Sequence, residues 1–225
     1  MDLYDVMRTT PAVREFTDEP ALEQLPDAVL HRILDHARFA PSGGNRQGTR
    51  VVVVRDRATR ERLAELTRPA VRRYMAQKAA GESPWNPLAP AGPSEEEIAG
   101  TEVPEAFVRP VLTAGAVLVF AVDLAVVAAM DQHLDRVGVV SGASVYPFVW
   151  NVLLAARAEG LGGTITTMAV AEEPAVRDLL GIPASYAVAA VVPLGRPVRE
   201  VTRLRRNPVE EIATVDRFDG PPVTG

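Results

Sequence analysis

Arginines near the two ends of the chain are the residues with the clearest chemical use. Arg8 and Arg14 lie near the N-terminus, and Arg203, Arg205 and Arg206 lie near the C-terminus. A guanidinium group is planar, permanently charged and rich in donors, so two such clusters could clamp one phosphate from two sides. Any one of these arginines, taken alone, is more often a solvated surface charge. The two clusters therefore predict a phosphate site only in combination.

Several common catalytic centres are excluded by residue counts. The chain contains no cysteine, which removes thiolate nucleophiles, disulfides, cysteine-ligated iron–sulfur clusters and cysteine zinc sites. Its one lysine, Lys78, has no glycine-rich lead-in, so a Walker phosphate loop is absent and a Schiff-base mechanism is poorly supported. Gly160, Gly162 and Gly163 follow a helical pattern and precede a strand pattern, which is the reverse of the order in a dinucleotide fingerprint.

Histidines and serines add only weak signals. The histidines include no pair spaced four residues apart, and no acidic residue completes a zinc signature, so we predict no metal site. Residues 142–146 begin like the nucleophile elbow of hydrolases, but the closing glycine is missing and no clear strand precedes them. A serine hydrolase is therefore a weak alternative.

The composition is that of a soluble globular protein with one large domain or two small ones. The 225 residues are 47% hydrophobic and 24% charged, with a formal net charge of −5. This acidic balance argues against nucleic-acid binding, which needs a basic surface. The apolar run at residues 114–122 is too short for a membrane span of roughly 20 residues. Because the chain also starts without a basic and apolar leader, we expect a cytoplasmic protein with no nucleic-acid or membrane partner.

The polar loops that could bind a ligand lie between elements with clear hydrophobic periodicity. Apolar residues repeat at helical spacing over residues 27–40, which predicts a helix. A polar loop at 41–47 separates it from a β-branched run at 50–54, which we expect to be a strand covered on both faces. Further along, the patterns predict helices at 57–78, 141–159 and 174–180 and strands at 114–122, 164–167 and 187–194. This irregular interleaving favours an α+β or three-layer αβα domain over a regular doubly wound one.

Residues 81–110 form a long irregular segment. They contain six prolines and glycines at 81, 92 and 100, and no apolar period persists through them. Such segments in compact domains are usually lids, binding loops or disordered. Trp85 offers a large flat side chain that could cover a ligand there, or it could anchor the loop on the core.

Five motifs, in order along the chain, resemble those of the FMN-dependent nitroreductase family. Residues 14–20 resemble its opening Arg-x-Phe motif, and residues 40–47 are close to its Ala-Pro-Ser-x-x-Asn-x-Gln motif. Residues 142–147 and 151–162 resemble its central helix and the loop after it, and residues 205–211 resemble its basic-Pro-Glu-Glu segment. Because they occur in the family's order over most of the chain, coincidence is improbable.

The resemblance implies an α+β, three-layer αβα fold around a central mixed, mainly antiparallel sheet. It implies that residues 1–225 form one nitroreductase-like domain, with 81–110 as an irregular lid or insertion and 207–225 as a C-terminal extension. It also implies an intertwined homodimer that exchanges helices and binds two FMN molecules at its interface. The sequence departs from the family at residues 10–12, which read Thr-Pro-Ala where a basic residue and a serine are common.

Site residues follow from the same resemblance. Arg14 and the Arg205/Arg206 pair would hold the flavin phosphate, the loop after residue 40 would contact FMN from the opposite subunit, and residues 163–167 would run beside the ring. We assign Tyr146 and Trp85 to the substrate pocket. The FMN-binding residues implied are Arg14, Pro41, Ser42, Gly43, Asn45, Gly163, Thr166, Thr167, Arg205 and Arg206.

The activity implied is hydride transfer from NADPH or NADH, through FMN, to a nitroaromatic, quinone or similar small oxidised acceptor. No catalytic side chain is required, because the flavin carries the chemistry. Within the same family the flavin can instead serve dehydrogenation, flavin destruction or dehalogenation. A flavin- or ligand-binding protein without NAD(P)H turnover is the alternative from another class.

Overall fold

Four strands form one sheet in the order β1-β2-β4-β3 in the computed structural model, which describes residues 2–17, 25–89 and 92–225. Neighbouring strands pair antiparallel. Within the described part of the chain, the only parallel pairing is an isolated bridge between Ala12 and Gly163, so the sheet itself is antiparallel rather than mixed. The strands are β1 (Thr49–Val54), β2 (Ala116–Asp123), β3 (Gly162–Gly163) and β4 (Tyr186–Gly195).

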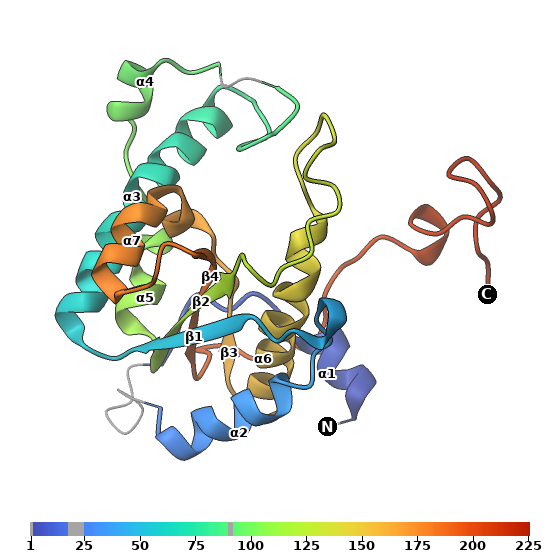
Figure 1. Ribbon diagram of the computed structural model, residues 1–225, viewed down its shortest axis with the longest axis horizontal. Helices are drawn as coiled ribbons and strands as arrows, with labels where there is room; N and C mark the ends of the chain where they lie inside the picture. Colours follow the sequence, from blue (N-terminus) through green and yellow to red (C-terminus); the bar gives the residue numbers. More distant parts are fainter. Residues whose placement is uncertain (1, 18–24, 90–91) are drawn as a thin grey trace.

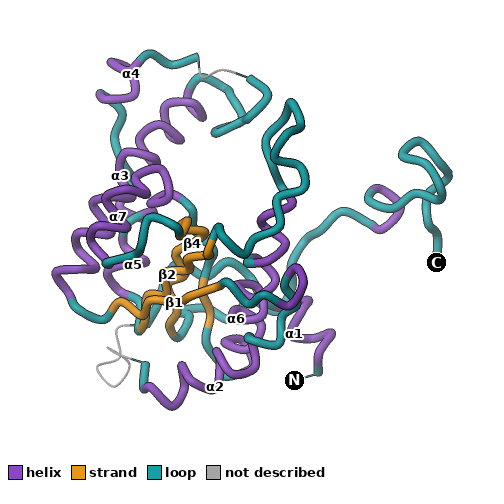
Figure 2. Tube along the Cα trace, in the orientation of Figure 1, coloured by secondary structure: helices purple, strands orange, loops and turns teal. Residues whose placement is uncertain are grey.

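Helices cover both faces of this sheet (Figure 1). One face packs against α2 and α6, and the other against α3, α5 and α7 (Figure 2). The α+β fold with three αβα layers is thereby confirmed. The α-helices are α1 (Leu3–Thr9), α2 (Asp27–Ala37), α3 (Arg57–Ala79), α4 (Glu95–Ala99), α5 (Arg109–Thr113), α6 (Tyr146–Ala158) and α7 (Glu173–Leu180).

The central strand β2 contributes side chains to both hydrophobic cores. Leu118 and Phe120 belong to the core under α2 and α6, whereas Val117 and Val119 belong to the core under α3 and α5. Seven of the eight β2 residues are buried. Because both of its faces are covered, β2 is a continuous apolar run rather than an alternating one.

Strand β4 contains a β-bulge. Opposite the step from Phe120 to Ala121 in β2, the pairing register skips Ala189. An extra residue in one strand reverses the alternation beyond it. Val188 and Val191 therefore lie in the same core although they are three residues apart.

The predicted helices and strands agree with the structure except near the sheet edges. β1 is an edge strand with mostly half-buried side chains, but both of its faces are covered as predicted: Val51 and Val53 pack against the core under α2 and α6, and Val52 and Val54 against the core under α3 and α5. Residues 164–167 are not a strand: only Thr166 bridges to Val191, and the chain then enters the 3₁₀-helix η5 (Met168–Glu172). The predicted helix at 141–159 begins instead as the 3₁₀-helix η4 (Val140–Ser144), and α6 starts at Tyr146.

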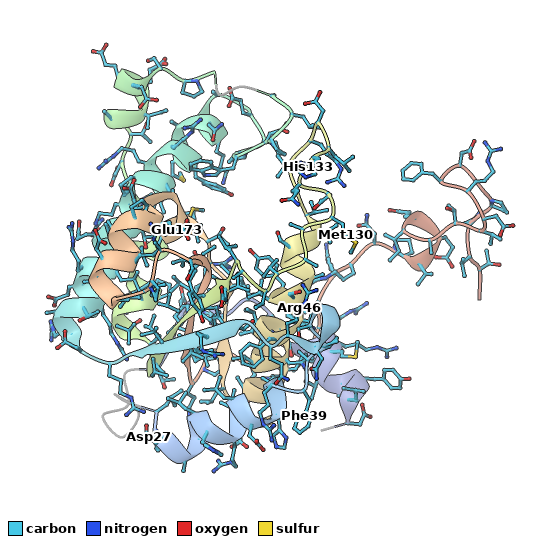
Figure 3. The ribbon with its side chains drawn as sticks, in the orientation of Figure 1. Asp27, Phe39, Arg46, Met130, His133 and Glu173 are labelled. Carbon is cyan, nitrogen blue, oxygen red and sulfur yellow. The ribbon has the colours of Figure 1, made fainter. Side chains whose placement is uncertain are left out.

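Long irregular segments project from the layers. Residues 81–110 are mostly loop, with only α4, the start of α5 and the 3₁₀-helix η3 (Glu105–Phe107), and residues 90–91 lie outside the described residues. The loop that carries Met130 and His133 projects above α6 (Figure 3). Residues 196–225, here called the C-terminal segment, begin beside residues 15–17 and then extend away from the layers (Figure 1). No helix in the described residues is long and apolar enough to cross a membrane.

Close packing at Gly163 gives a test of this architecture. A Cβ atom there would lie 2.6 Å from the Pro193 carbonyl oxygen and 2.5 Å from Leu194 Cδ2, so the backbone of β4 would have to shift. We expect Gly163→Ala to lower the free energy of unfolding by about 1–3 kcal/mol. Gly100→Ala is the matched control, because the nearest atom to its added Cβ is 3.5 Å away. Thermal melts of the two variants with equal midpoints would contradict the packing.

Candidate functional site

Arg14 is positioned by the segment that packs against β3. The Val13 amide donates to the Gly163 carbonyl at 2.8 Å, and Val13 is buried while Arg14 is exposed. This approach requires a glycine at position 162, where an added Cβ would lie 2.5 Å from Val13 Cγ2. The glycines after α6 therefore bring the N-terminal segment to the sheet edge. Arg14 is the first residue of the motif at 14–20, whose last three positions lie outside the described residues.

A cavity of about 140 Å³, here called the Arg14 cavity, brings together three of the predicted FMN-binding residues. Arg14 lines it with Thr166 and Thr167. Reciprocal backbone hydrogen bonds of 2.8 and 2.9 Å between Thr166 and Val191 fix this wall to the sheet. The remaining lining residues are Phe107, Pro110, Val111, Thr164, Ile165, Met168 and Pro193.

A second cavity of about 190 Å³, here called the Ser42 cavity, is lined by Pro41, Ser42 and Ser144 among others. Ser42 precedes the short 3₁₀-helix η2 (Gly43–Asn45), and its hydroxyl accepts a hydrogen bond from the Gln47 amide at 3.0 Å. The Ser144 hydroxyl accepts one from the Gly43 amide at 3.2 Å. This role of Ser144 has no local sequence signal, because the partner lies 101 residues away.

The backbone after Ser42 is held in an unusual conformation. Asn45 and Gln47 adopt φ angles of 53° and 50°, in the left-handed region that non-glycine residues seldom occupy. Such backbone angles cost of order 1–3 kcal/mol each and cluster at ligand-binding sites. We infer that residues 42–47 are shaped for a ligand rather than for stability.

The buried carboxylate of Asp131 anchors the loop that leads to Ser144. Its side chain is 5% exposed and accepts hydrogen bonds from the Val139 and Val140 amides at 2.7 and 3.2 Å. Arg136 Nη1 donates to it at 2.8 Å. These donors, with the Val139 amide first and Arg136 next, lower the pKa of Asp131 from 3.8 to about 2. Nothing in the local sequence pattern marked this aspartate.

The Arg205/Arg206 pair does not share a cavity with Arg14. Both side chains are exposed on the C-terminal segment, where Arg206 Nη1 donates to the Arg205 carbonyl at 2.7 Å. This segment leaves the body beside Arg14, however, because the Val198 amide donates to the Glu15 carbonyl at 3.2 Å. Arg205 and Arg206 therefore lie a short way along the chain from Val198, which pairs beside Arg14. In the described structure they do not contact Arg14 itself.

The predicted substrate residues lie apart from each other. The Tyr146 hydroxyl donates to the Ala189 carbonyl at 3.2 Å and so caps the β-bulge of β4. The Trp85 ring lies 4.8 Å below the Arg73 guanidinium, in a third cavity. Thr10, at the departure from the family motif, is buried, and its hydroxyl donates to the Val6 carbonyl at 2.6 Å. It caps α1 and does not face the Arg14 cavity.

The Arg14 cavity and the Ser42 cavity carry polar groups that suit the same kind of ligand. Arg14 supplies a positive charge, and the turn at 42–47 supplies hydroxyl and amide groups at a strained backbone. Across residues 2–17, 25–89 and 92–225, no cluster of three or more metal-binding side chains is present. Such groups suit an anionic ligand with a polar, planar edge.

Comparison with known proteins agrees with this description. A model of the nitroreductase family matches residues 8–196. A Thermus thermophilus protein named NADH dehydrogenase is 30% identical over 210 residues, which are 89% of this chain and 89% of that protein. Iodotyrosine deiodinase bound to FMN and 3-iodo-L-tyrosine has a TM-score of 0.68 at 21% identity, covering 96% of this chain and 100% of its own. The NADPH:FMN oxidoreductase of Vibrio harveyi, complexed with NAD⁺, has a TM-score of 0.65 at 19% identity, covering 96% and 77%.

The Asp131 anchor predicts a pH-dependent contribution to stability. Because its folded-state pKa lies below the ordinary 3.8, the carboxylate stabilises the fold above about pH 4, and this contribution is lost as the pH falls through about 2. We expect Asp131→Asn to melt at a lower temperature than the wild type at pH 6, with a difference that shrinks between pH 4 and pH 2. The exposed Asp135→Asn is the control and should melt like the wild type at each pH. Equal melting of Asp131→Asn and the wild type at pH 6 would contradict the anchor.

Proposed function

This chain belongs to the nitroreductase family of flavin oxidoreductases, and we propose that it uses FMN to transfer a hydride from NADPH or NADH to a small oxidised acceptor. The acceptor is a nitroaromatic, a quinone or a molecule of similar kind. Family membership makes the chain an enzyme, which decides against the alternative of a ligand-binding protein without turnover.

The observation that carries the FMN proposal is the Arg14 cavity. It joins a guanidinium group from the N-terminal motif to the wall at Thr166 and Thr167, as the resemblance implied. The chemistry of this donor set fits a flavin mononucleotide, which has a phosphate at one end and a polar ring edge at the other. Two of the similar solved structures carry FMN in their names.

Each group of residues then has a distinct task. Arg14 binds the phosphate, and Arg205 and Arg206 add charge from the C-terminal segment. The loop at 42–47 and the backbone at 164–167 orient the ring by hydrogen bonds to its polar edge. Bound FMN would supply the hydride chemistry, so the protein has to bind, orient and exclude water rather than provide a nucleophile. Tyr146, with its hydroxyl held by Ala189, lines the acceptor side as a rigid wall.

A homodimer completes this proposed site. The Arg14 and Ser42 cavities, of about 140 and 190 Å³, are each smaller than the roughly 300 Å³ at which ligand pockets usually begin. Two half-sites of this size are expected when one flavin lies between two protomers. The C-terminal segment also exposes large apolar side chains that a partner would cover, among them Ile212 at 72% and Phe218 at 102% exposure.

FMN should be released when the purified protein is denatured, and Arg14→Ala should weaken its binding. Loss of one charge-assisted hydrogen bond to phosphate costs roughly 1.5–3 kcal/mol, or about one to two decades in affinity. Riboflavin lacks the phosphate and should lose much less. Arg206→Ala is expected to show the same selectivity, whereas Arg199→Ala, an exposed neighbour, should leave both affinities unchanged.

Titration of flavin-free protein by fluorescence quenching measures these affinities. A native protein that neither contains FMN nor takes it up at micromolar concentration contradicts the proposed function. Unchanged FMN affinity in both Arg14→Ala and Arg206→Ala would reject the phosphate assignment alone.

The C-terminal segment provides a test of the dimer. Replacing both Ile212 and Phe218 with Asp should increase the monomer fraction in sedimentation velocity, because buried charges oppose association. Leu88→Asp is the control: Leu88 is 90% exposed in residues 80–89, here called the Trp85 loop, far along the chain from the C-terminal segment. A wild-type protein that sediments as an FMN-loaded monomer would overturn the dimer.

A further inference from the structure

A third cavity, of about 530 Å³, lies where the second half of α3 meets the Trp85 loop, α4 and the end of η5. Its volume is in the range of small-molecule sites. We call it the Arg73 cavity. It is lined by Pro69, Ala70, Arg72, Arg73, Trp85, Glu95, Ile98, Ala99, Ala171 and Glu172.

Arg73 has unused hydrogen-bonding capacity in this cavity. Its Nε is buried and has no hydrogen-bond partner within the described residues. Its guanidinium lies over the Trp85 ring at 4.8 Å from the centroid, which fixes its plane without satisfying its donors. The neighbouring Arg72 uses Nε to donate to the Thr101 carbonyl at 3.2 Å. Within the described residues, no hydrogen bond or ion pair uses the terminal nitrogens of this guanidinium either, so they are free to bind an acceptor in the cavity.

Buried polar contacts hold the cavity wall in place. Gln77 is 3% exposed; its Oε1 accepts from the Trp85 amide at 3.1 Å, and its Nε2 donates to Glu82 at 3.1 Å. Glu82 in turn accepts from the Gly92 amide at 2.6 Å. Trp85 itself has a φ of 58°, a left-handed angle that these contacts maintain. The segment carrying Trp85 is therefore built as a fixed wall.

The charges that line the cavity select the ligand. Arg72 and Arg73 are balanced by Glu95 and Glu172, so the lining has no net charge. Such a lining does not favour a multiply charged phosphate, and a single negative group would bind locally, at the Arg73 guanidinium. Trp85, Pro69 and Ile98 supply an apolar surface that suits a ring.

We propose that the Arg73 cavity binds the carboxylate end of an aromatic acceptor. This inference rests on the proposed function and names the substrate class of the same site. The short helix η5 links the two regions, because Met168 lines the Arg14 cavity while Ala171 and Glu172 line this one.

A matched pair of acceptors tests the proposal. 4-Nitrobenzoate and 4-nitrobenzamide share the ring and the nitro group and differ in charge. With the FMN-loaded enzyme, we expect Arg73→Gln to lower kcat/KM for 4-nitrobenzoate by about ten- to a hundredfold, the effect of one charge-assisted hydrogen bond, and to change the amide much less. Arg62→Gln, an exposed arginine earlier on α3, should affect neither acceptor.

Binding without turnover separates this proposal from the proposed function. Equilibrium dialysis of 4-nitrobenzoate against the purified protein, without NADPH or NADH, should show binding that Arg73→Gln and Arg72→Gln weaken. If the protein proves to lack FMN but this binding is found, the cavity assignment stands and the oxidoreductase function fails. Arg73→Gln and Arg72→Gln are both tested so that a folding defect in one of them does not decide the result. A thermal melt of each variant would reveal such a defect.

Other outcomes overturn the proposal while leaving the flavin chemistry intact. One is an active enzyme in which Arg73→Gln and Arg72→Gln change both nitro compounds equally. Another is a selective rise in KM for NADPH over NADH in Arg73→Gln, because the cavity would then recognise the additional phosphate of the nucleotide. A third is the absence of any 4-nitrobenzoate binding at millimolar concentration.

Discussion

The close approach of residues 12–16 to the glycines at the sheet edge is the contact on which the candidate site depends. Val13 packs against Gly162, and Phe16 packs against Gly195, where an added Cβ would lie 2.7 Å from the Phe16 ring. The backbone hydrogen bond from Val13 to Gly163 fixes the segment in this place with the Val13 side chain facing inward. The next side chain, that of Arg14, therefore has to face outward. The same contact orders the start of the C-terminal segment, which pairs with residues 15–17. The N-terminal segment and the start of the C-terminal segment therefore come together at these glycines, and not through contacts between their arginines.

Hydrophobic periodicity was sufficient to predict the main helices and strands that form the three layers. The runs that became β2, β4, α2 and α3 are long and strongly patterned, and the structure confirms them within a few residues. Short elements were missed for a physical reason: in α1, only Val6 is buried, so no apolar stripe exists to be read. Residues 164–167 have strand-like composition, but the chain turns into η5 after one bridge, and the next β4 amide along, that of Val188, donates to the Glu173 carboxylate instead of to a strand.

The residues of the candidate site that sequence analysis picked out are those in motifs that are continuous in sequence. Arg14 and the loop at 42–47 belong to such motifs, and the structure places each in a cavity. Ser144, Asp131 and Gln77 could not be found in this way, because each acts on backbone amides whose positions are set by the fold. In the loop that contains Trp85 and in the loop before Ser144, polar side chains accept hydrogen bonds from backbone amides that a helix or strand would otherwise satisfy. Arg73 could not be predicted from the sequence either, because it stands out only by a donor, Nε, that has no partner in the folded structure.

The bulge at Ala189 has a consequence for how this chain can vary in length. Elsewhere on the surface, an insertion or deletion alters a loop and leaves the cores unchanged. Deleting Ala189 would restore a regular ladder with β2 in which every other pair is kept, so the residues before it would keep their faces. Val188 would still pair with Ala121 and stay in the core under α3 and α5, but the Tyr146 hydroxyl would lose its acceptor. Elsewhere in β4 a deletion would move the residues before it to the other side of the sheet, so the bulge is where this strand can change its length without exchanging residues between the two cores.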